Sequence, residues 1–163
     1  MFLQPSKLPA QTLAITCLAS FAALTAALVA QHAFGVRPCA WCVLQRGVFL
    51  LLGVVAGLGW LLKRNTSLRS VFLALSAALG LSGFAAAYYQ WTVASKLVSC
   101  DMTLADRIVT ALDLETLLPK VFMITGSCAD ADKYRLIGLP YEVWSGLLFA
   151  GLTVLALLAV RKR

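Results

Sequence analysis

The sequence predicts an all-α membrane protein, a bundle of four transmembrane helices with two extracytoplasmic loops. Of its 163 residues, 61% are hydrophobic and only 13% are charged, whereas the apolar share of a soluble domain is roughly half. Four apolar runs, residues 13–30, 43–62, 71–89 and 143–160, are each about 18–20 residues long, enough to cross a hydrocarbon core of roughly 30 Å. We expect residues 1–163 to form one membrane domain.

The first run, residues 13–30, could be confused with a cleaved signal peptide. Its apolar part exceeds the roughly 7–15 residues of a signal sequence, and no clean small-x-small cleavage site precedes Gln31. We therefore interpret it as a permanent helix. Cys17 lies alone within it, and we interpret this residue as a small packing residue.

The second run, residues 43–62, contains one charge, Arg46, and follows two cysteines, Cys39 and Cys42. The third run includes ALSAALGLSGFAAA, residues 74–87, whose small side chains allow helix backbones to approach closely in lipid. The fourth run ends on the basic residues of the C-terminus.

The charges predict the orientation. With four spans, the two termini and the 63–70 connection share one side, which holds seven basic residues and no acid (Lys7, Lys63, Arg64, Arg69, Arg161, Lys162, Arg163). This asymmetry indicates the cytoplasmic face. All seven acids lie on the other side (Asp101, Asp106, Asp113, Glu115, Asp130, Asp132, Glu142). The net charge of +7 thus reflects topology, and nucleic-acid binding is not indicated.

Two loops, about residues 31–42 and 91–142, are expected on the extracytoplasmic side. They hold four of the five cysteines: Cys39 and Cys42 in the short loop, Cys100 and Cys128 in the long one. In a bacterial envelope that compartment is oxidising, so paired thiols there are expected to form disulfides.

The long loop also contains TLADRIVTALDLETLLPKVF, residues 103–122. Leu104, Ile108, Ala111, Leu112 and Leu118 lie broadly on one helical face, which predicts an amphipathic helix on the membrane surface. A helix packed on the bundle ends is an equal alternative. Pro119 is expected to bend or end this helix.

The Cys39-x-x-Cys42 motif has three interpretations. A zinc site lacks a second closely spaced pair, since 27 residues separate Cys100 from Cys128 and His32 is the single histidine. A structural disulfide over so short a loop would restrain little chain entropy. Redox exchange is favoured, because Cys42 is predicted at a helix N-terminus, where negative charge is stabilised.

Arg46 falls one helical turn deeper on the face of Cys42. Its guanidinium could stabilise the Cys42 thiolate or a reduced, negatively charged acceptor; the alternative is that it reaches to the membrane interface. Two cysteine pairs on one face suggest a relay by thiol–disulfide exchange. The chain has no dinucleotide-binding or haem-attachment motif, so a membrane quinone, which takes two electrons, is the economical acceptor.

The sequence resembles the bacterial disulfide-bond-formation protein B family over nearly its whole length. The resemblance rests on PCAWCVLQR at residues 38–46, SCD at 99–101, PKVFMITGSC at 119–128 and GLPYEVWS at 138–145, together with the four-span layout. It implies an inner-membrane enzyme that reoxidises a periplasmic thioredoxin-fold dithiol protein of the DsbA type and passes the electrons to ubiquinone or menaquinone.

The resemblance also implies roles for single residues. The partner's thiolate would attack the Cys100–Cys128 disulfide at Cys100, and Cys128 would exchange with Cys39. Cys42 would face the quinone, with Arg46 stabilising the charged pair and the reduced ring, and the quinone would restore the Cys39–Cys42 disulfide.

This chain departs from the family pattern in three places. Where some members carry a histidine after the third span it reads YYQWT, residues 88–92, so a proton or quinone contact there would come from Gln90 or Trp91. Lys120 replaces a familiar glutamine, and Pro140 lies four residues before Trp144 rather than closer to it.

Two rival functions stay open. A vitamin K epoxide reductase-like protein also has four spans and loop cysteines, but its motif resembles an arrangement near the last span, whereas here it opens the second. A membrane scaffold with two structural disulfides is the non-enzymatic alternative.

Overall fold

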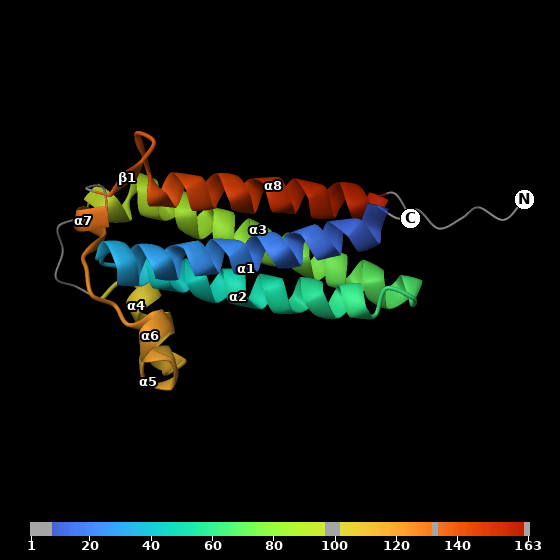
Figure 1. Ribbon diagram of the computed structural model, residues 1–163, viewed down its shortest axis with the longest axis horizontal. Coiled ribbons are helices and arrows are strands. Elements are labelled where there is room, and N and C mark those ends of the chain that lie inside the picture. The colour runs from blue at the N-terminus through green and yellow to red at the C-terminus, as the bar shows by residue number, and fades with distance from the viewer. Residues whose placement is uncertain (1–7, 97–101, 132–133, 162–163) are drawn as a thin grey trace, which may run out of the picture.

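The computed structural model describes residues 8–96, 102–131 and 134–161. Four long helices lie side by side (Figure 1): α1 Leu8–Phe34, α2 Ala40–Leu61, α3 Thr66–Thr92 and α8 Tyr141–Arg161. All four are long and apolar enough to cross a membrane, which confirms the predicted membrane bundle. Helices α1, α3 and α8 extend beyond both ends of the apolar runs that predicted them, and α2 begins three residues earlier than its run and ends one residue before it. Hydropathy marks the lipid-facing stretch and not the end of the helical backbone.

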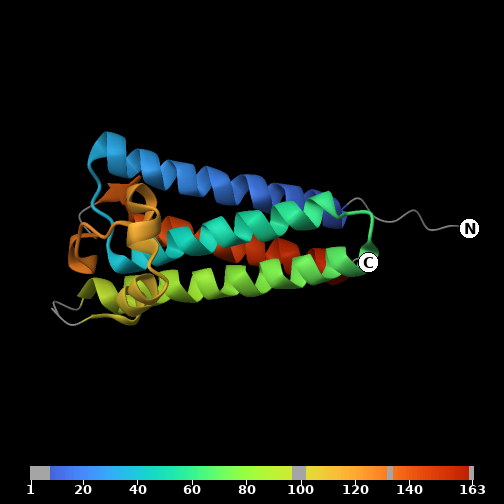
Figure 2. The same cartoon turned by 90° about the horizontal axis from the view of Figure 1, so that it is seen from below.

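Helix α2 lies between α1 and α3 (Figure 2), and α8 packs along α3 and α1. The small residues of α3 form the close contact, as the sequence predicted: Ser76, Ala77, Gly80, Gly83, Ala86 and Ala87 are among its buried residues. A Cβ atom at Gly83 would lie 2.4 Å from Cε1 of Phe149 on α8. The two helices therefore approach each other at a point where no side chain larger than hydrogen fits.

The two ends of the bundle differ in charge. The first residues of α1, the α2–α3 turn and the last turn of α8 lie at one end, and the short elements between α3 and α8 lie at the other (Figure 1). Lys63, Arg64 and Arg161 are therefore at the first end, and among the described acids Asp106, Asp113, Glu115 and Glu142 are at the second. This separation is the one that the predicted topology requires.

The long loop departs from the prediction. After η1 (Ala94–Lys96), the single helix expected over residues 103–122 is instead three short helices, α4 Leu104–Ala111, α5 Leu114–Leu117 and α6 Pro119–Phe122. A capping box between Thr103 and Asp106 starts α4. Asp113, in the left-handed conformation with φ of 52°, separates α4 from α5. The helical backbone is interrupted at Leu118, just before Pro119, as expected. Pro119 then begins α6, since proline suits a first helical position.

Helix α4 packs on the end of α2, the alternative to a helix lying only on the membrane surface. Ala105 and Val109 are fully buried, and Val109 packs in a cluster with Val43 and Phe122. Two residues of the predicted apolar face, Leu104 and Leu112, are 61% and 58% exposed. The face of α4 that packs on the bundle, with Ala105 and Val109, is therefore distinct from the leucine face that the sequence indicated for the membrane surface.

The remaining elements connect the loop to the last helix. Helix α7, Cys128–Ala131, lies against η1. Strand β1, Arg135–Leu136, pairs antiparallel with β2, Leu139–Pro140, in a two-residue ladder that the sequence did not predict. Gly138, with φ of 81°, supplies the turn between them.

Candidate functional site

Cys39 and Cys42 lie at the start of α2. Cys39 is the N-cap, with extended backbone, and its carbonyl accepts the N–H of Val43 at 2.9 Å. Cys42 is in the first turn, as predicted, where the unpaired N–H groups of a helix stabilise negative charge. The two sulfur atoms are 3.3 Å apart and carry no disulfide in this structure. A two-electron oxidation could therefore join them with little movement.

The loop before Cys128 docks on the loop before Cys39. The N–H groups of Thr125 and Gly126 both donate to the carbonyl of Pro38, at 3.0 and 3.1 Å. A Cβ atom at Gly126 would lie 2.8 Å from the carbonyl oxygen of Arg37, so this close approach requires glycine. The docking brings Cys128 into the cluster of side chains around Cys39.

Cys39 is the buried member of this group, only 1% exposed. Hydrogen bonding with Cys128 and with Cys42, together with burial, raises the pKa of Cys39 far above its usual range. The thiol form of Cys39 is therefore favoured over its thiolate. Its position between Cys42 and Cys128 lets it exchange with a sulfur from either loop.

Of the other two cysteines, the structure describes only Cys17. Cys100 lies outside the described residues, so its pairing with Cys128 stays a prediction. Cys17 packs with Leu13 and Ala56 within the bundle, and its sulfur would lie 3.2 Å from a Cβ atom at Gly57. This is the packing role that the sequence indicated for it.

Arg46 is buried at 5% exposure, so its side chain does not reach out to the interface. Its Nη1 donates to Oε1 of Gln31 and, at 2.9 Å, to the carbonyl of Val121, and its Nη2 donates to the carbonyl of Ala27 at 3.3 Å. His32, also on α1, bonds the carbonyl of Lys120 at 3.0 Å through Nε2. The guanidinium thus joins α2 to the end of α1 and to α6.

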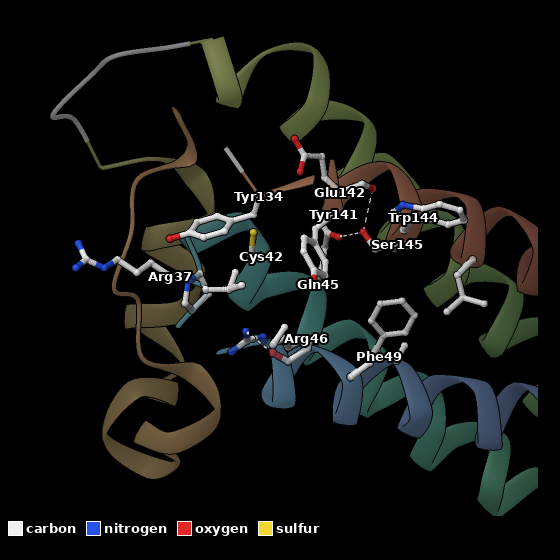
Figure 3. Close-up of a pocket in the computed structure, with 17 residues that line it drawn as sticks. Arg37, Cys42, Gln45, Arg46, Phe49, Tyr134, Tyr141, Glu142, Trp144 and Ser145 are labelled. Carbon is white, nitrogen blue, oxygen red and sulfur yellow. Dashed lines mark hydrogen bonds between the residues drawn. The ribbon is translucent and has the colours of Figure 1, made fainter. Parts of the chain in front are cut away.

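A cavity of about 230 Å³ opens beside Cys42 (Figure 3). Both Cys42 and Arg46 line it, which is the pairing that the sequence predicted. Its walls are mostly apolar, and its size is below the roughly 300–1,000 Å³ of pockets for drug-sized ligands. The other lining residues come mainly from α1, α2 and α8: Ala23, Ala26, Ala27, Ala30, Val36, Arg37, Pro38, Gln45, Phe49, Tyr134, Tyr141, Glu142, Trp144, Ser145 and Leu148.

Gln90 contacts the cysteine rather than the cavity. It is fully buried, and its Nε2 donates to Sγ of Cys42 at 3.2 Å. Gln45 donates in turn to Oε1 of Gln90 at 2.8 Å. Trp91, the other residue named from the sequence at this place, is 50% exposed and does not line the cavity.

The sequence did not identify Gln45 or Ser145 as site residues. Ser145 on α8 donates to Oε1 of Gln45, an interaction drawn in Figure 3. A signal was present, because an uncharged amide within an apolar span costs free energy unless a partner satisfies it. The sequence could not reveal which partner that was.

Comparison with known proteins agrees with these features. A family model described as disulfide bond formation protein DsbB matches residues 9–159. A protein named disulfide bond formation protein B from Dechloromonas aromatica (strain RCB) is 34% identical, over 96% of this chain and 96% of its own length. Its namesake from Polaromonas naphthalenivorans (strain CJ2) is 32% identical, over 98% and 96%. Another, from Verminephrobacter eiseniae (strain EF01-2), is 33% identical, over 93% and 86%.

Proposed function

This chain belongs to the disulfide bond formation protein DsbB family, and on that premise we propose that it reoxidises a periplasmic DsbA-type dithiol protein and passes the electrons to a membrane quinone. The family makes it a membrane disulfide oxidoreductase. That activity sets aside the scaffold alternative, in which the disulfides would only hold loops together. The bacterial inner membrane, with the cysteines on the periplasmic face, is the proposed location.

The proposed relay begins at Cys100. The partner's thiolate attacks the Cys100–Cys128 disulfide, forms a mixed disulfide with Cys100 and releases Cys128 as a thiolate. Cys128 then attacks Cys39, which breaks the Cys39–Cys42 bond and leaves Cys42 as the thiolate. The second thiolate of the partner displaces Cys100 and completes the partner's disulfide. The Cys100 thiolate then attacks Cys128, which breaks the Cys39–Cys128 bond, re-forms the Cys100–Cys128 disulfide and releases Cys39 beside Cys42. The contact of Cys39 with both Cys42 and Cys128 supports this order of exchange.

The cavity supports quinone as the acceptor. Apolar alanine and aromatic side chains line most of it. Cys42 contributes its thiol, and Arg37, Arg46 and Glu142 are the charged residues at its wall. When bound there, a quinone would accept two electrons and two protons. Cys42 supplies the electrons as its disulfide with Cys39 re-forms, and Arg46 stabilises negative charge at the cavity wall.

The single observation that carries the proposal is that Cys42 contacts Cys39 on one side and lines the cavity on the other. The test is to purify the full chain in detergent, add a reduced thioredoxin-fold dithiol protein and a ubiquinone analogue, and follow quinone absorbance. We expect loss of quinone absorbance that depends on both additions. Oxidation of the dithiol at the same rate without quinone would overturn the assignment of the acceptor.

Replacing Arg46 with glutamine is expected to weaken quinone use. The variant loses the charge at the cavity wall, and a charged hydrogen bond is worth about 1.5–3 kcal/mol, so KM for the quinone analogue should rise by roughly tenfold or more. Exchange between the partner and Cys100 should continue. The Arg107→Gln variant is the control, since Arg107 is exposed on α4. An unchanged KM in Arg46→Gln would assign Arg46 only to joining α1, α2 and α6.

A further inference from the structure

Cys42 is the last member of a chain of hydrogen bonds that crosses three helices. Ser145 of α8 donates to Gln45 of α2, Gln45 donates to Gln90 of α3, and Gln90 donates to the sulfur of Cys42. We propose that Gln45, Gln90 and Ser145 are positioning residues for Cys42. Their hydrogen bonds stabilise the Cys42 thiolate when they run in this direction, and they stabilise the Cys42 thiol when every bond is reversed. The inference rests on the proposed role of Cys42 and deepens it.

Two members of this chain of hydrogen bonds, Gln45 and Gln90, are buried. Gln90 is 0% exposed and Gln45 is 4% exposed, each within a helix apolar enough to span a membrane. A buried amide without a partner costs free energy of about 1–3 kcal/mol. Hydrogen bonds among these side chains and to Cys42 avoid that cost.

The observed direction suits a thiolate. Nε2 of Gln45 donates to Oε1 of Gln90. The NH₂ group of Gln90 is therefore the part of its amide that faces the sulfur. A thiolate accepts such a hydrogen bond and has no proton to give. Each donor in the chain then points toward Cys42, and a chain of aligned hydrogen bonds is mutually polarised.

The same residues can also accept the hydrogen bond that a Cys42 thiol donates. When both amides turn over, Cys42 donates to Oε1 of Gln90, Gln90 donates to Gln45, and Gln45 donates to Oγ of Ser145. The hydroxyl of Ser145 then needs another acceptor, and the carbonyl of Glu142 lies 3.0 Å from its oxygen. The proton passes between Sγ and the cavity, while the amides change only the direction of their bonds. Neither state leaves a member of the chain unsatisfied.

Other titratable groups surround Cys42 and act on its thiol in the parent and in every variant alike. Cys39 contacts its sulfur, and Arg46 and Glu142 line the same cavity from α2 and α8. Arg37, Tyr134 and Tyr141 also line that cavity. None of these side chains belongs to the chain of amides. Variants at residues 45, 90 and 145 therefore change the hydrogen bonds and leave the surrounding charges as they are.

The test measures Cys42 directly. The reduced full chain in detergent, without quinone or partner, is pulsed with iodoacetamide at several pH values, and modification of Cys42 is read by peptide mass spectrometry. In Gln90→Leu the pH of half-maximal reactivity should rise by about one unit, the effect of one lost hydrogen bond to a charged group. Gln45→Leu and Ser145→Ala should give smaller rises, because they remove only the support of Gln90.

The matched control is Thr92→Val on the same helix, whose hydroxyl donates to the carbonyl of Tyr88, at 2.7 Å. It should titrate like the parent. A parent-like profile in Gln90→Leu would overturn the proposal. If the pH of half-maximal reactivity shifts in Gln90→Leu but in neither Gln45→Leu nor Ser145→Ala, Gln90 acts alone, and the proposed chain of hydrogen bonds is overturned. Ser145→Ala removes a single oxygen atom, so it tests the proposal even where a buried leucine disturbs folding.

The reversal has its own signature. In a chain labelled with ¹⁵N-glutamine, the side-chain amide resonances of Gln45 and Gln90 should both move through the titration of Cys42, and neither should move in Cys42→Ser. Movement of Gln90 alone would overturn the reversal. Because no quinone or partner is added, failure here is distinct from failure of the turnover assay that tests the proposed function.

Discussion

Replacing Cys42 with serine is expected to lower quinone-linked turnover by about 1,000-fold or more, as removal of a reacting nucleophile does in other enzymes. A hydroxyl cannot form a disulfide with Cys39, so no electron pair can leave the cysteines at the cavity. Quinone absorbance, followed with reduced partner present, measures the loss. Cys17→Ser is the control, since Cys17 packs within the bundle, and it should turn over like the parent.

The same variant should accumulate a Cys39–Cys128 disulfide after exposure to oxidised partner, because Cys39 keeps Cys128 as its remaining neighbour. Peptide mapping without reduction would reveal it.

In Cys100→Ser, turnover with the protein partner should also vanish, while a small dithiol should still reduce the Cys39–Cys42 disulfide. If Cys42→Ser or Cys100→Ser turns over like the parent, the relay is wrong.

Replacing Gly83 with valine is expected to lower the free energy of unfolding by about 3 kcal/mol, the upper end of the usual cost of overpacking. A Cβ atom there would lie 2.4–2.6 Å from three atoms of the Phe149 ring. That ring is fully buried and stacks on Phe49 with 3.9 Å between centroids, so it has no free direction in which to move. Thermal unfolding in detergent measures the loss.

Gly151→Val on α8 is the matched control. No atom lies within 4 Å of a Cβ built at Gly151, so the same change of side chain meets open space. Its unfolding temperature should stay within about 2 °C of the parent's, as for exposed substitutions generally. Equal losses in the two variants would mean that the backbone preference of valine, and not the α3–α8 contact, determines the result.

The long helices were predictable because their signal is strong and local. An apolar run of bilayer length has few alternative structures, and the small residues of α3 face α8 as their composition indicated. The loop helices carried a weaker signal. Nothing in the local sequence indicates the left-handed conformation of Asp113 that divides α4 from α5, and the buried face of α4 was determined by Val43 and Phe122, which are distant in sequence.

The site was predictable in its chemistry more than in its contacts. Cys42 is in the first turn of α2 and shares a cavity with Arg46, as the spacing within the second span indicated. The proximity of Cys128 to Cys39 arises from backbone hydrogen bonds to Pro38, which no side-chain pattern encodes. Gln90 was named with Trp91 as a proton or quinone contact, and in the structure its amide bonds the sulfur of Cys42. Partners across a bundle depend on helix rotation, and one sequence does not determine that rotation.

The hydrogen bonds from Thr125 and Gly126 to Pro38 have a kinetic consequence. They hold Cys128 beside Cys39 by fixing the two loops to each other, so the exchange between these sulfurs is unimolecular. Well-oriented intramolecular reactions reach effective molarities of roughly 10⁵–10⁸ M. In the proposed relay this step is therefore independent of protein concentration, and the encounter with the soluble partner is the step that responds to crowding and abundance in the compartment.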